Sequence, residues 1–365
     1  IGINLNASQY KQNNPSTSSY AAGISRIALT PPVVGINQNT EEGGYYAYCG
    51  SFIVNPLAQL RDEKNFTRTR NIRNNIYAEI NFLPELKLKS SFGSFWTNAS
   101  VEEYYKNNIN RGKGSTAYAV SSEHTNYLTE HVLSYDKTFN DFALSAIAGF
   151  SYQEDLYYYI RAAQSGFADD DVQTLNAGTT MTEATSSKSK WTLMSFFSRL
   201  NMSYKDRYLA YFSIRRDGSS RFGKDNRWGY FPAGSVGWRV TEENFMKDVK
   251  WLSNLKLKAS YGVAGNNNIS DYASLSTLAS NDYIWKDQVV SGYAIGGYEN
   301  TELGWEKTFT WDYGIELGFL KNRIQLNIDY FNAHTKDLLL SLNIPQVTGF
   351  SSTVKNLGEV ENKGV

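Results

Sequence analysis

Apolar and polar residues alternate one by one along most of this 365-residue chain. Between Phe309 and Phe319 every second residue is apolar, and the residues between them are polar or glycine. Side chains two positions apart lie on the same face of a strand, so the pattern predicts strands with one apolar and one polar face. About twelve segments follow this pattern. They are residues 1–10, 76–82, 86–96, 127–139, 142–150, 194–202, 208–214, 229–240, 255–263, 309–319, 324–330 and 338–344.

The connections between these segments alternate in length. Short connections fall at residues 83–85, 140–141, 205–206 and 320–322, and long polar stretches cover 11–69, 97–126, 157–187, 217–228 and 265–307. This order places every long connection at one end of the sheet, as in an outer-membrane barrel, whereas a soluble β-sandwich has no reason to keep it. One connection on the short side, residues 241–254, is longer than expected. Its residues Glu242, Glu243, Met246, Val249 and Trp251 predict a helical turn.

The apolar faces have the length and the freedom from charge that a bilayer requires. A strand of about 12 residues, tilted near 45°, rises about 28 Å, which is close to the thickness of a hydrocarbon core. A one-residue shift in register would turn Lys256 or Arg323 toward lipid, at a cost of about 2–4 kcal/mol for each basic group. Aromatic residues such as Trp96 and Phe319 end several faces and fit an interfacial girdle. The sequence therefore predicts an all-β, transmembrane antiparallel β-barrel.

The composition of the chain excludes several other classes of protein. The chain has 36 Lys+Arg and 36 Asp+Glu, so no overall field attracts nucleic acid. Its mean hydropathy is -0.46 and it has no run of about 18 apolar residues, which excludes a helical membrane protein. Cys49 is the single cysteine and forms no internal disulfide. One alternative stays open, a soluble or surface-anchored all-β glycan-binding or adhesin module whose apolar faces pack on one another.

An ordered series of motifs resembles one family. The series contains RRDGSSRFG at 215–223, WGYFP at 228–232, GWR at 237–239, EENF at 242–245, LKLKASYG at 255–262, GNN at 265–267, WEK at 305–307 and NLG at 356–358. In this order the motifs resemble the barrel of SusC/RagA-type TonB-linked outer-membrane transporters, most strongly from about residue 190 onward. The residues carried over as a structural signature are Arg216, Asp217, Gly218, Ser219, Ser220, Arg221, Phe222, Trp228, Gly229, Phe231, Pro232, Gly237 and Trp238.

The resemblance implies an importer in the outer membrane of a Gram-negative bacterium. Such a transporter has an N-terminal plug inside a barrel of the 22-stranded class, and the TonB complex acts on a segment before the plug. A SusD-like lipoprotein caps the extracellular loops, and the cargo is an oligosaccharide or a peptide. The sequence shows no plug pattern and no TonB-binding segment. We therefore expect residues 1–365 to be the first half of the barrel domain, without the plug and the last strands.

Residues 217–220 have the composition of a turn, in which Gly218 can adopt a positive φ and Asp and Ser can bond the local backbone. We expect Arg216 and Arg221 to pair with Asp217 or Asp225 and to stay out of lipid. A structural role is expected for these residues in place of a cargo-binding role.

Nothing in the sequence indicates an enzyme. His124, His131 and His334 form no zinc motif, and neither a nucleophile elbow nor a P-loop is present. An all-β glycosidase would need two converging carboxylates, which the sequence does not indicate. No cofactor is expected, except for a calcium ion on Asp169, Asp170 and Asp171 in a long loop, where a solvated acidic tip is the alternative.

Aromatic residues beyond the apolar segments are the candidates for cargo binding, because Tyr and Trp rings pack on sugars or peptide side chains while their polar atoms form hydrogen bonds. The alternatives are packing between loops and contact with the lipoprotein lid. Residues 11–69, rich in Asn, Ser and Tyr, are a second candidate for the lid contact. The candidate cargo residues are Tyr157, Tyr158, Tyr159, Arg161, Tyr283, Trp285, Tyr293 and Tyr298.

Overall fold

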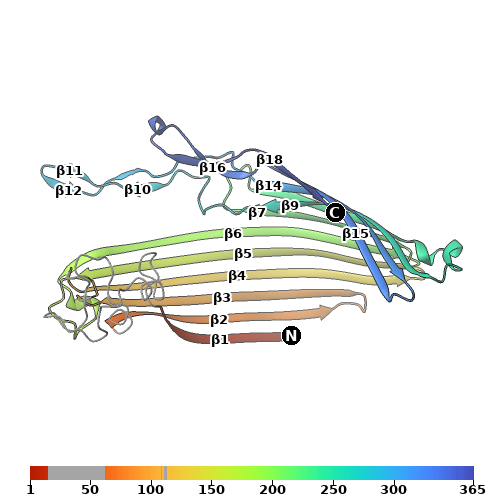
Figure 1. Ribbon diagram of the computed structural model, residues 1–365, viewed down its shortest axis with the longest axis horizontal. Coiled ribbons are helices and arrows are strands. Elements are labelled where there is room, and N and C mark those ends of the chain that lie inside the picture. The colour runs from red at the N-terminus through yellow and green to blue at the C-terminus, as the bar shows by residue number, and fades with distance from the viewer. Residues whose placement is uncertain (15–61, 108, 111–112) are drawn as a thin grey trace, which may run out of the picture.

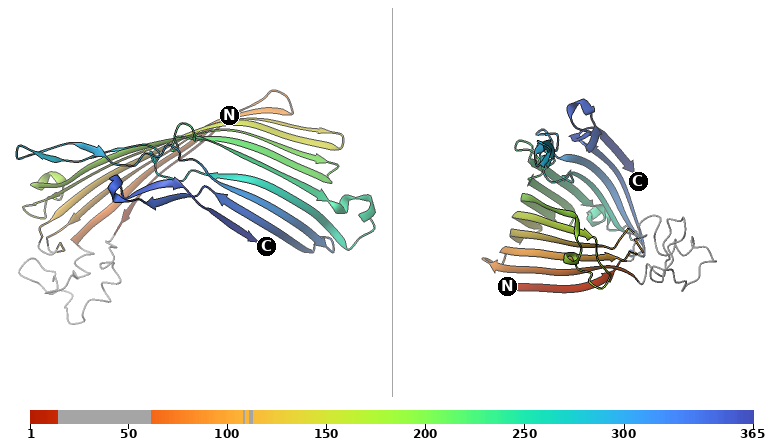
Figure 2. Two further views of the ribbon diagram at one scale, coloured as in Figure 1. Left: turned by 90° about the horizontal axis from the view of Figure 1, so that it is seen from above. Right: turned by 90° about the vertical axis from the view of Figure 1, so that its left-hand side faces the viewer.

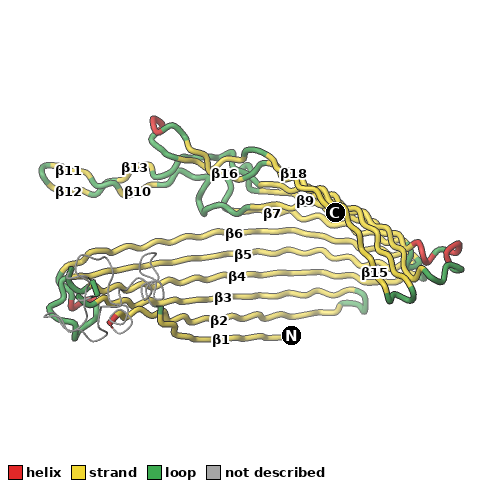
Figure 3. Tube along the Cα trace, viewed as in Figure 1, coloured by secondary structure: helices red, strands yellow, loops and turns green. Residues whose placement is uncertain are grey.

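The computed structural model describes residues 1–14, 62–107, 109–110 and 113–365, which form one antiparallel sheet of twelve strands and three small two-stranded sheets (Figure 1 and Figure 3). Neighbours in the sheet follow chain order, β1 to β9 and then β14, β15 and β18. The sheet strands are β1 (Gly2–Asn13), β2 (Glu63–Asn81), β3 (Leu86–Tyr105), β4 (Thr116–Phe139), β5 (Phe142–Ser165), β6 (Thr180–Tyr204), β7 (Tyr208–Ser219), β8 (Trp228–Arg239), β9 (Leu252–Asn266), β14 (Glu306–Phe319), β15 (Ile324–Lys336) and β18 (Glu359–Gly364). The predicted all-β, antiparallel class is confirmed.

The sheet is a single curved layer with β1 and β18 at its edges, and it does not close (Figure 2). Its register joins the apolar residues of neighbouring strands into one face: Phe92 lies opposite Ile76, and Phe150 lies opposite Phe196. We call this the outer face and the opposite one the inner face. Many outer-face side chains are exposed, among them Phe92, and no second layer of the described part covers them. This arrangement contradicts the alternative of a sandwich.

The outer face is apolar over only part of each long strand. On β5 the residues from Phe142 to Tyr152 that face outward carry no charge, and the next one is Glu154. Eleven residues tilted near 45° rise about 26 Å, the height of the apolar band of a membrane barrel. Strands β4, β5 and β6 have 24, 24 and 25 residues, so they extend well beyond this band.

These extensions correct the predicted long connections. β3 and β4 continue into residues 97–126 and leave only residues 106–115 between them, and β5 and β6 likewise leave only residues 166–179 of 157–187. β1 and β2 extend into residues 11–69, of which residues 15–61 lie outside the described ones, and β7 extends into residues 217–228. The prediction was wrong here because backbone pairing continues where the apolar, lipid-facing signal stops.

The short connections agree with the predictions. β4 and β5 are joined through Asn140, whose φ is 50°, and β6 and β7 are joined through Lys205 and Asp206, with φ of 53° and 54°. Such left-handed residues match the twist of a tight hairpin. We call this end of the sheet the turn end and the opposite end the loop end.

The longer connection at the turn end folds as predicted into helical turns, the 3-10 helices η2 (Val240–Glu242) and η3 (Asn244–Met246). Elsewhere, η1 (Leu175–Ala177) and η4 (Gln346–Thr348) are single 3-10 turns at the loop end. In the part of the chain that the structure describes, no helix is long and apolar enough to cross a membrane.

One predicted strand belongs elsewhere. The alternating residues 338–344 form β16 (Leu339–Asn343), which pairs with β17 (Ser352–Asn356) in a hairpin outside the sheet. The twelfth sheet strand is β18, whose residues 359–364 are polar or glycine apart from Val360 and show no apolar face. Asp337, with a φ of 57°, turns the chain away from the sheet before β16. The count of about twelve is right, but the last member was misassigned.

Candidate functional site: an inner wall and a loop cluster

A row of rings crosses the inner face above the apolar band, from β2 to β5. The Arg73 guanidinium lies 5.0 Å from the centroid of the Phe95 ring. Phe95 meets His124 edge-on at 6.2 Å, and His124 meets Tyr157 at 6.4 Å. Each residue comes from a different strand, so the antiparallel register holds the row together. We call Arg73, Phe95, His124 and Tyr157 the inner-wall row.

Polar groups beside this row are held by one carboxylate. His124 Nε2 lies 2.8 Å from Asp155 Oδ2, and Asn126 Nδ2 donates to the same oxygen at 2.8 Å. Gln153 Nε2 donates to Asn126 Oδ1 at 3.2 Å. Asp155 is nearly buried, whereas the His124 side chain is 40% exposed. Ring faces beside fixed amide and carboxylate groups are the chemistry that packs on sugar rings or peptides and hydrogen-bonds their polar groups.

The first group of predicted cargo residues lies in β5 and not in a loop. Tyr157, Tyr159 and Arg161 face inward, and Tyr158 faces outward. Arg161 Nε lies 3.1 Å from Glu183 Oε2, and its guanidinium lies 5.1 Å from the Tyr118 ring. The four candidates therefore belong to two faces of one strand, and their role in cargo binding stays a prediction.

Sequence reasoning missed Phe95, His124 and Asp155. The sequence could have indicated them. Phe95, Asn126 and Asp155 each lie an odd number of positions from the outward-facing apolar residues of their strand, which places them on the inner face. Pairing the strands in register would have placed them beside Tyr157.

At the loop end, a small hydrophobic core joins three connections. It contains Phe222, Phe231, Leu303 and Trp305, of which Phe222 and Leu303 are fully buried. The Trp305 ring lies 5.2 Å from Phe222 and 5.1 Å from Phe231, and Trp305 Nε1 donates to the Arg227 carbonyl at 2.9 Å. Leu339 and Val354 of the β16–β17 hairpin pack against it. We call this core the loop cluster.

Charged residues of the signature have partners other than the predicted ones. Asp217 accepts from Arg215 Nε at 2.7 and 2.8 Å, and Arg221 Nε donates to Asp271 at 2.9 Å. Arg216 faces outward, where its guanidinium lies 4.4 Å from the Trp228 ring. The predicted pairing of Arg216 and Arg221 with Asp217 or Asp225 was wrong, because Arg215 shares the inner face with Asp217 and Arg216 does not.

The turn predicted at residues 217–220 begins later, since Asp217, Gly218 and Ser219 are the last residues of β7. Gly218 has no positive φ, and a Cβ there would lie 2.8 Å from the Trp228 ring. Ser219 is fully buried and its Oγ accepts from Asn267 Nδ2 at 3.1 Å, while Ser220 Oγ accepts from the Thr192 amide at 2.8 Å.

The rest of the signature spans β8. Gly229 lies against the Phe231 ring, where a Cβ would come within 2.4 Å of it. Pro232 lies opposite Ile214, and Gly237 and Trp238 lie near the turn end of the strand.

A ribbon of two consecutive two-stranded sheets projects from the loop cluster beyond the main sheet, at the far left of Figure 1. β10 (Leu278–Ser280) pairs with β13 (Tyr293–Ile295), and β11 (Tyr283–Trp285) pairs with β12 (Gln288–Val290). The predicted residues Tyr283, Trp285 and Tyr293 lie on it and are exposed. Tyr298 follows the ribbon in the chain, is also exposed, and packs on the Phe350 ring at 5.9 Å. We call residues 278–295 the projecting ribbon.

The predicted calcium site lacks a suitable arrangement. Asp170 accepts hydrogen bonds from Tyr104 at 2.8 Å and Ser115 at 2.6 Å, and Asp169 Oδ1 accepts from the Asp171 amide at 3.0 Å. Burial and the nearby Asp170 carboxylate raise the pKa of Tyr104 to about 12. Across residues 1–14, 62–107, 109–110 and 113–365, no group of three His, Cys, Asp or Glu side chains can hold a metal ion. The acidic tip instead ties two connections together.

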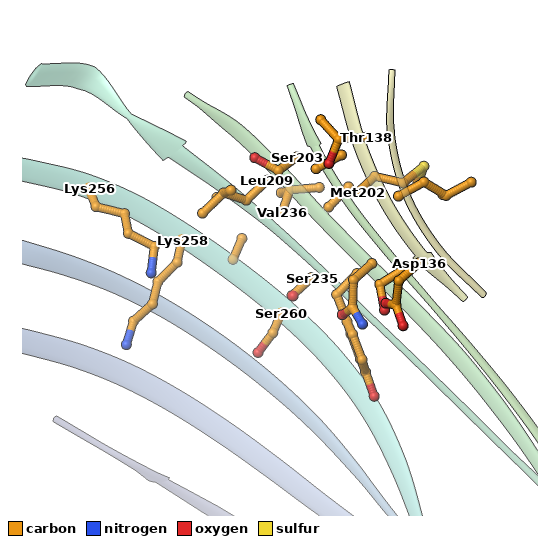
Figure 4. A pocket seen from close by; sticks show the side chains of 18 of the residues that line it. Asp136, Thr138, Met202, Ser203, Leu209, Ser235, Val236, Lys256, Lys258 and Ser260 are labelled. Atoms are coloured by element: carbon orange, nitrogen blue, oxygen red, sulfur yellow. The ribbon is translucent and has the colours of Figure 1, made fainter. Parts of the chain in front are cut away.

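Near the turn end the inner face lines a hollow of about 780 Å³ (Figure 4). Its wall carries Lys256 and Lys258, which share Glu316 at 3.4 and 3.5 Å. Lys258 also lies 2.7 Å from Asp329. Both charges therefore face the inside of the curved sheet, as the register argument from the sequence requires.

The antiparallel sheet has an exposed apolar face, a polar inner face and its long connections at one end. These are the features of the wall of an outer-membrane-type β-barrel. A family model, TonB-dependent receptor-like β-barrel, matches residues 7–365. The chain belongs to this family, whose members are transporters and receptors of Gram-negative outer membranes and not enzymes.

Two curated relatives show the same relationship. TonB-dependent receptor P3 of Formosa agariphila is 32% identical over 374 residues, which cover 100% of this chain and 37% of that protein. SusC of Bacteroides thetaiotaomicron is 34% identical over 324 residues, which cover 85% of this chain and 32% of that protein. The chain thus spans about a third of the length of the curated relatives it matches.

Solved structures agree with this assignment. A structure of the RagAB peptide transporter matches with a TM-score of 0.81 and 26% identity, over 88% of this chain and 36% of that chain. The RagAB peptide importer in its open-open state matches with a TM-score of 0.86 over 99% of this chain and 41% of that chain. At 24% identity the second match supports the fold alone. The predicted SusC/RagA-type resemblance is confirmed.

Proposed function

We propose that this chain forms part of the barrel of a TonB-dependent outer-membrane importer of oligosaccharides or peptides. The observation that carries the proposal is the exposed, uncharged outer face, which continues from β1 to β15 at the height of a bilayer. The inner-wall row then lies on the import pathway, and the loop cluster lies at the mouth of that pathway. The loop end is extracellular, because long connections lie outside the cell in such barrels.

Cargo contacts the inner-wall row on its way inward. His124 and Tyr157 offer half-exposed rings, while Asp155 and Asn126 supply fixed hydrogen-bonding groups. Neither a cofactor nor a catalytic group is needed for binding of this kind. The plug, the remaining strands and the N-terminal segment that reaches the TonB complex belong to the whole protein, of which these residues are the first half of the barrel.

A SusD-like lipoprotein binds the projecting ribbon. Its hydrophobic side chains are unusually exposed for a connection between strands, with Tyr293 at 79%, Ile284 at 75% and Val289 at 74%. Exposed apolar surface of this density marks a site of protein association. The loop cluster holds the base of the ribbon, so the partner meets a pre-formed surface.

The proposal is tested with the full-length protein, tagged and extracted from outer membranes in mild detergent. We expect heat-modifiable migration, co-purification of a lipoprotein, and oligosaccharides or peptides that mass spectrometry finds in the preparation. Ile284→Asp together with Val289→Asp removes the apolar contact, so the lipoprotein is lost while the barrel still assembles. Gln288→Asp, on the same hairpin, is the matched control and keeps the partner.

Recovery of the protein as a water-soluble monomer would contradict the whole proposal. Retention of the lipoprotein by the double variant would contradict only the placement of the partner on the ribbon.

A further inference from the structure

The outer face has a hollow near the turn end that neither the inner wall nor the loop cluster uses. It has a volume of about 530 Å³, within the size range of ligand sites. Its floor is a row of small residues in register across three strands, Ala210 opposite Val236 and Val236 opposite Ala259. Two residues further from the turns, the large side chains of Phe212 and Tyr261 stand on either side of Gly234. The floor therefore lies lower than the large side chains beside it, and we call this hollow the trough.

The row on the turn side of the trough is aromatic and its polar atoms point to one carboxylate. Tyr204 lies opposite Tyr208, and Tyr208 lies opposite Trp238. Tyr208 Oη donates to Glu243 Oε1 at 2.6 Å, and Trp238 Nε1 donates to the same oxygen at 3.1 Å. Aromatic rings with an apolar body and a hydrogen-bonded polar edge are typical of the boundary between lipid and water.

Glu243 belongs to the long turn that carries η2 and η3, so these contacts hold that turn against the outer-face rim. The turn presents Phe245, which is 67% exposed, and Trp251, which is 60% exposed. Trp251 stacks on Phe319 of β14 at 6.0 Å with an interplanar angle of 4°. The turn thus extends the aromatic rim around the trough with two more exposed rings.

A cation lies at the edge of the trough. Lys205 Nζ is 5.4 Å from the centroid of the Tyr204 ring, which lines the trough. Lys205 pairs with Asp141 at 3.7 Å, where both side chains are largely exposed. An exposed pair at this distance is weak and yields readily to a phosphate. By contrast, Arg207 is held by Glu243 at 3.3 Å.

We propose that this trough binds a glycerophospholipid of the leaflet at the turn end, with one acyl chain on the floor of small residues and the phosphate on Lys205. The inference rests on the proposed membrane location but concerns a surface unrelated to import. The charge pattern selects this occupant, because the outward-facing side chains of the floor carry no charge and Lys205 stands at the water side. Lys258, which also lines the hollow, belongs to the inner face, where it pairs with Glu316 and Asp329. A second copy of the chain would instead have to cover the exposed rings of the turn.

The test uses the full-length protein in nanodiscs of 1-palmitoyl-2-oleoyl-phosphatidylethanolamine, released into native mass spectrometry. We expect one phospholipid to remain bound after the bulk lipid has been stripped. Ala210→Phe fills the floor and removes this adduct. Lys205→Gln weakens its retention about fivefold, the effect of losing one partly exposed ion contact.

Two matched controls lie on other parts of the outer face. Ala148→Phe adds the same ring at an outward-facing alanine of β5 that does not line the trough. Lys137→Gln removes another rim lysine, which lies 5.5 Å from the Phe139 ring and pairs with Glu85 at 3.2 Å. Both keep the adduct if the site is the trough. Equal loss in Ala148→Phe, or an unchanged adduct in Ala210→Phe, would overturn the proposal.

Failure of this inference is distinguishable from failure of the proposed function. A heat-modifiable protein that takes up cargo yet shows no trough-dependent adduct contradicts the lipid site alone. A protein that does not enter nanodiscs at all contradicts the membrane location itself.

Discussion

The two ends of β8 use the same kinds of side chain in opposite ways. Phe231, at the loop end, points inward and packs with Trp305 in the loop cluster, where it is 8% exposed. Trp238, seven residues further along, points outward and is 37% exposed. Because side chains alternate between faces, an odd separation reverses the side, and one strand supplies both a core residue and a rim residue.

The difference shows what stabilises each end. The loop end buries rings against protein, so its connections depend on packing among themselves. The turn end leaves its rings exposed on the outer face and fixes their polar atoms through Glu243. Loss of an aromatic ring should therefore lower the local stability strongly at the loop end and only slightly at the turn end.

The largest effect is expected from Phe231→Ala. Removal of a buried phenyl ring costs about 3–5 kcal/mol, here in the local stability of the loop cluster. Limited proteolysis of the full-length protein in its membrane should then cleave the connection between β9 and β14 faster than in the unchanged protein. Trp238→Ala on the same strand is the control and should leave the rate of this cleavage unchanged. Faster cleavage of this connection in both variants would contradict the proposed difference between the loop end and the turn end.

A second substitution pair tests the two faces at the middle of the apolar band. Ile328→Arg places a cation on the outer face of β15 and should cost about 2–4 kcal/mol, which lowers the amount of heat-modifiable barrel. Asn327→Arg places the same group on the inner face, opposite Glu316, and should assemble normally. Equal assembly of both would mean that the outer face does not contact lipid.

Two glycines of β9 differ in the space that a side chain would have beside the loop cluster. A Cβ at Gly265 would lie 2.2 Å from the Phe231 ring, whereas a Cβ at Gly262 would meet its nearest neighbour, Ala233, at 3.4 Å. We expect Gly265→Ala to destabilise the loop cluster by about 1–3 kcal/mol through overpacking. Gly262→Ala should be nearly neutral in the same proteolysis assay. A protected cluster in Gly265→Ala would show that the Phe231 ring can move aside without loss.

The alternation predicted the sheet well because lipid imposes one rule on every outward residue of the band. Phe92 and Phe150 were assigned to the correct face from sequence alone. This constraint applies only within the apolar band, so the parts of β3 to β6 that extend beyond the band were interpreted as loops. β18 was missed for the same reason, since its residues 359–364 show no apolar face.

The candidate site was harder to predict because it depends on register between strands. Tyr157 was named as a candidate because of its ring, but its neighbours Phe95 and His124 come from other strands, and alternation does not specify which residues pair across strands. The loop cluster depends on contacts across large separations, such as Trp305 Nε1 with the Arg227 carbonyl, and no local pattern marks them.

Neighbouring tyrosines on β5 separate cargo binding from structure. Tyr157→Ala removes a ring from the inner-wall row and should weaken cargo binding about fivefold, the effect of one partly exposed aromatic contact. Tyr158→Ala removes the same side chain from the outer face and should leave affinity unchanged. Isothermal calorimetry on the full-length protein, with the cargo that co-purifies, measures both. Equal weakening would indicate that β5 contributes through its stability alone.

The smallest expected effect concerns pH at the turn end. The hydrogen bond from Tyr208, followed by that from Trp238, lowers the pKa of Glu243 below its ordinary value of 4.5. A lowered pKa means that the carboxylate stabilises the turn at all pH values above 4.5 and that this contribution is lost as the pH falls through the lowered value. A spin label on Met246→Cys, with Cys49→Ser, should gain mobility below pH 4.5. Glu243→Gln should remove this dependence and Glu242→Gln should keep it, because Glu243 makes the bonds to Tyr208 and Trp238 that couple the turn to the rim.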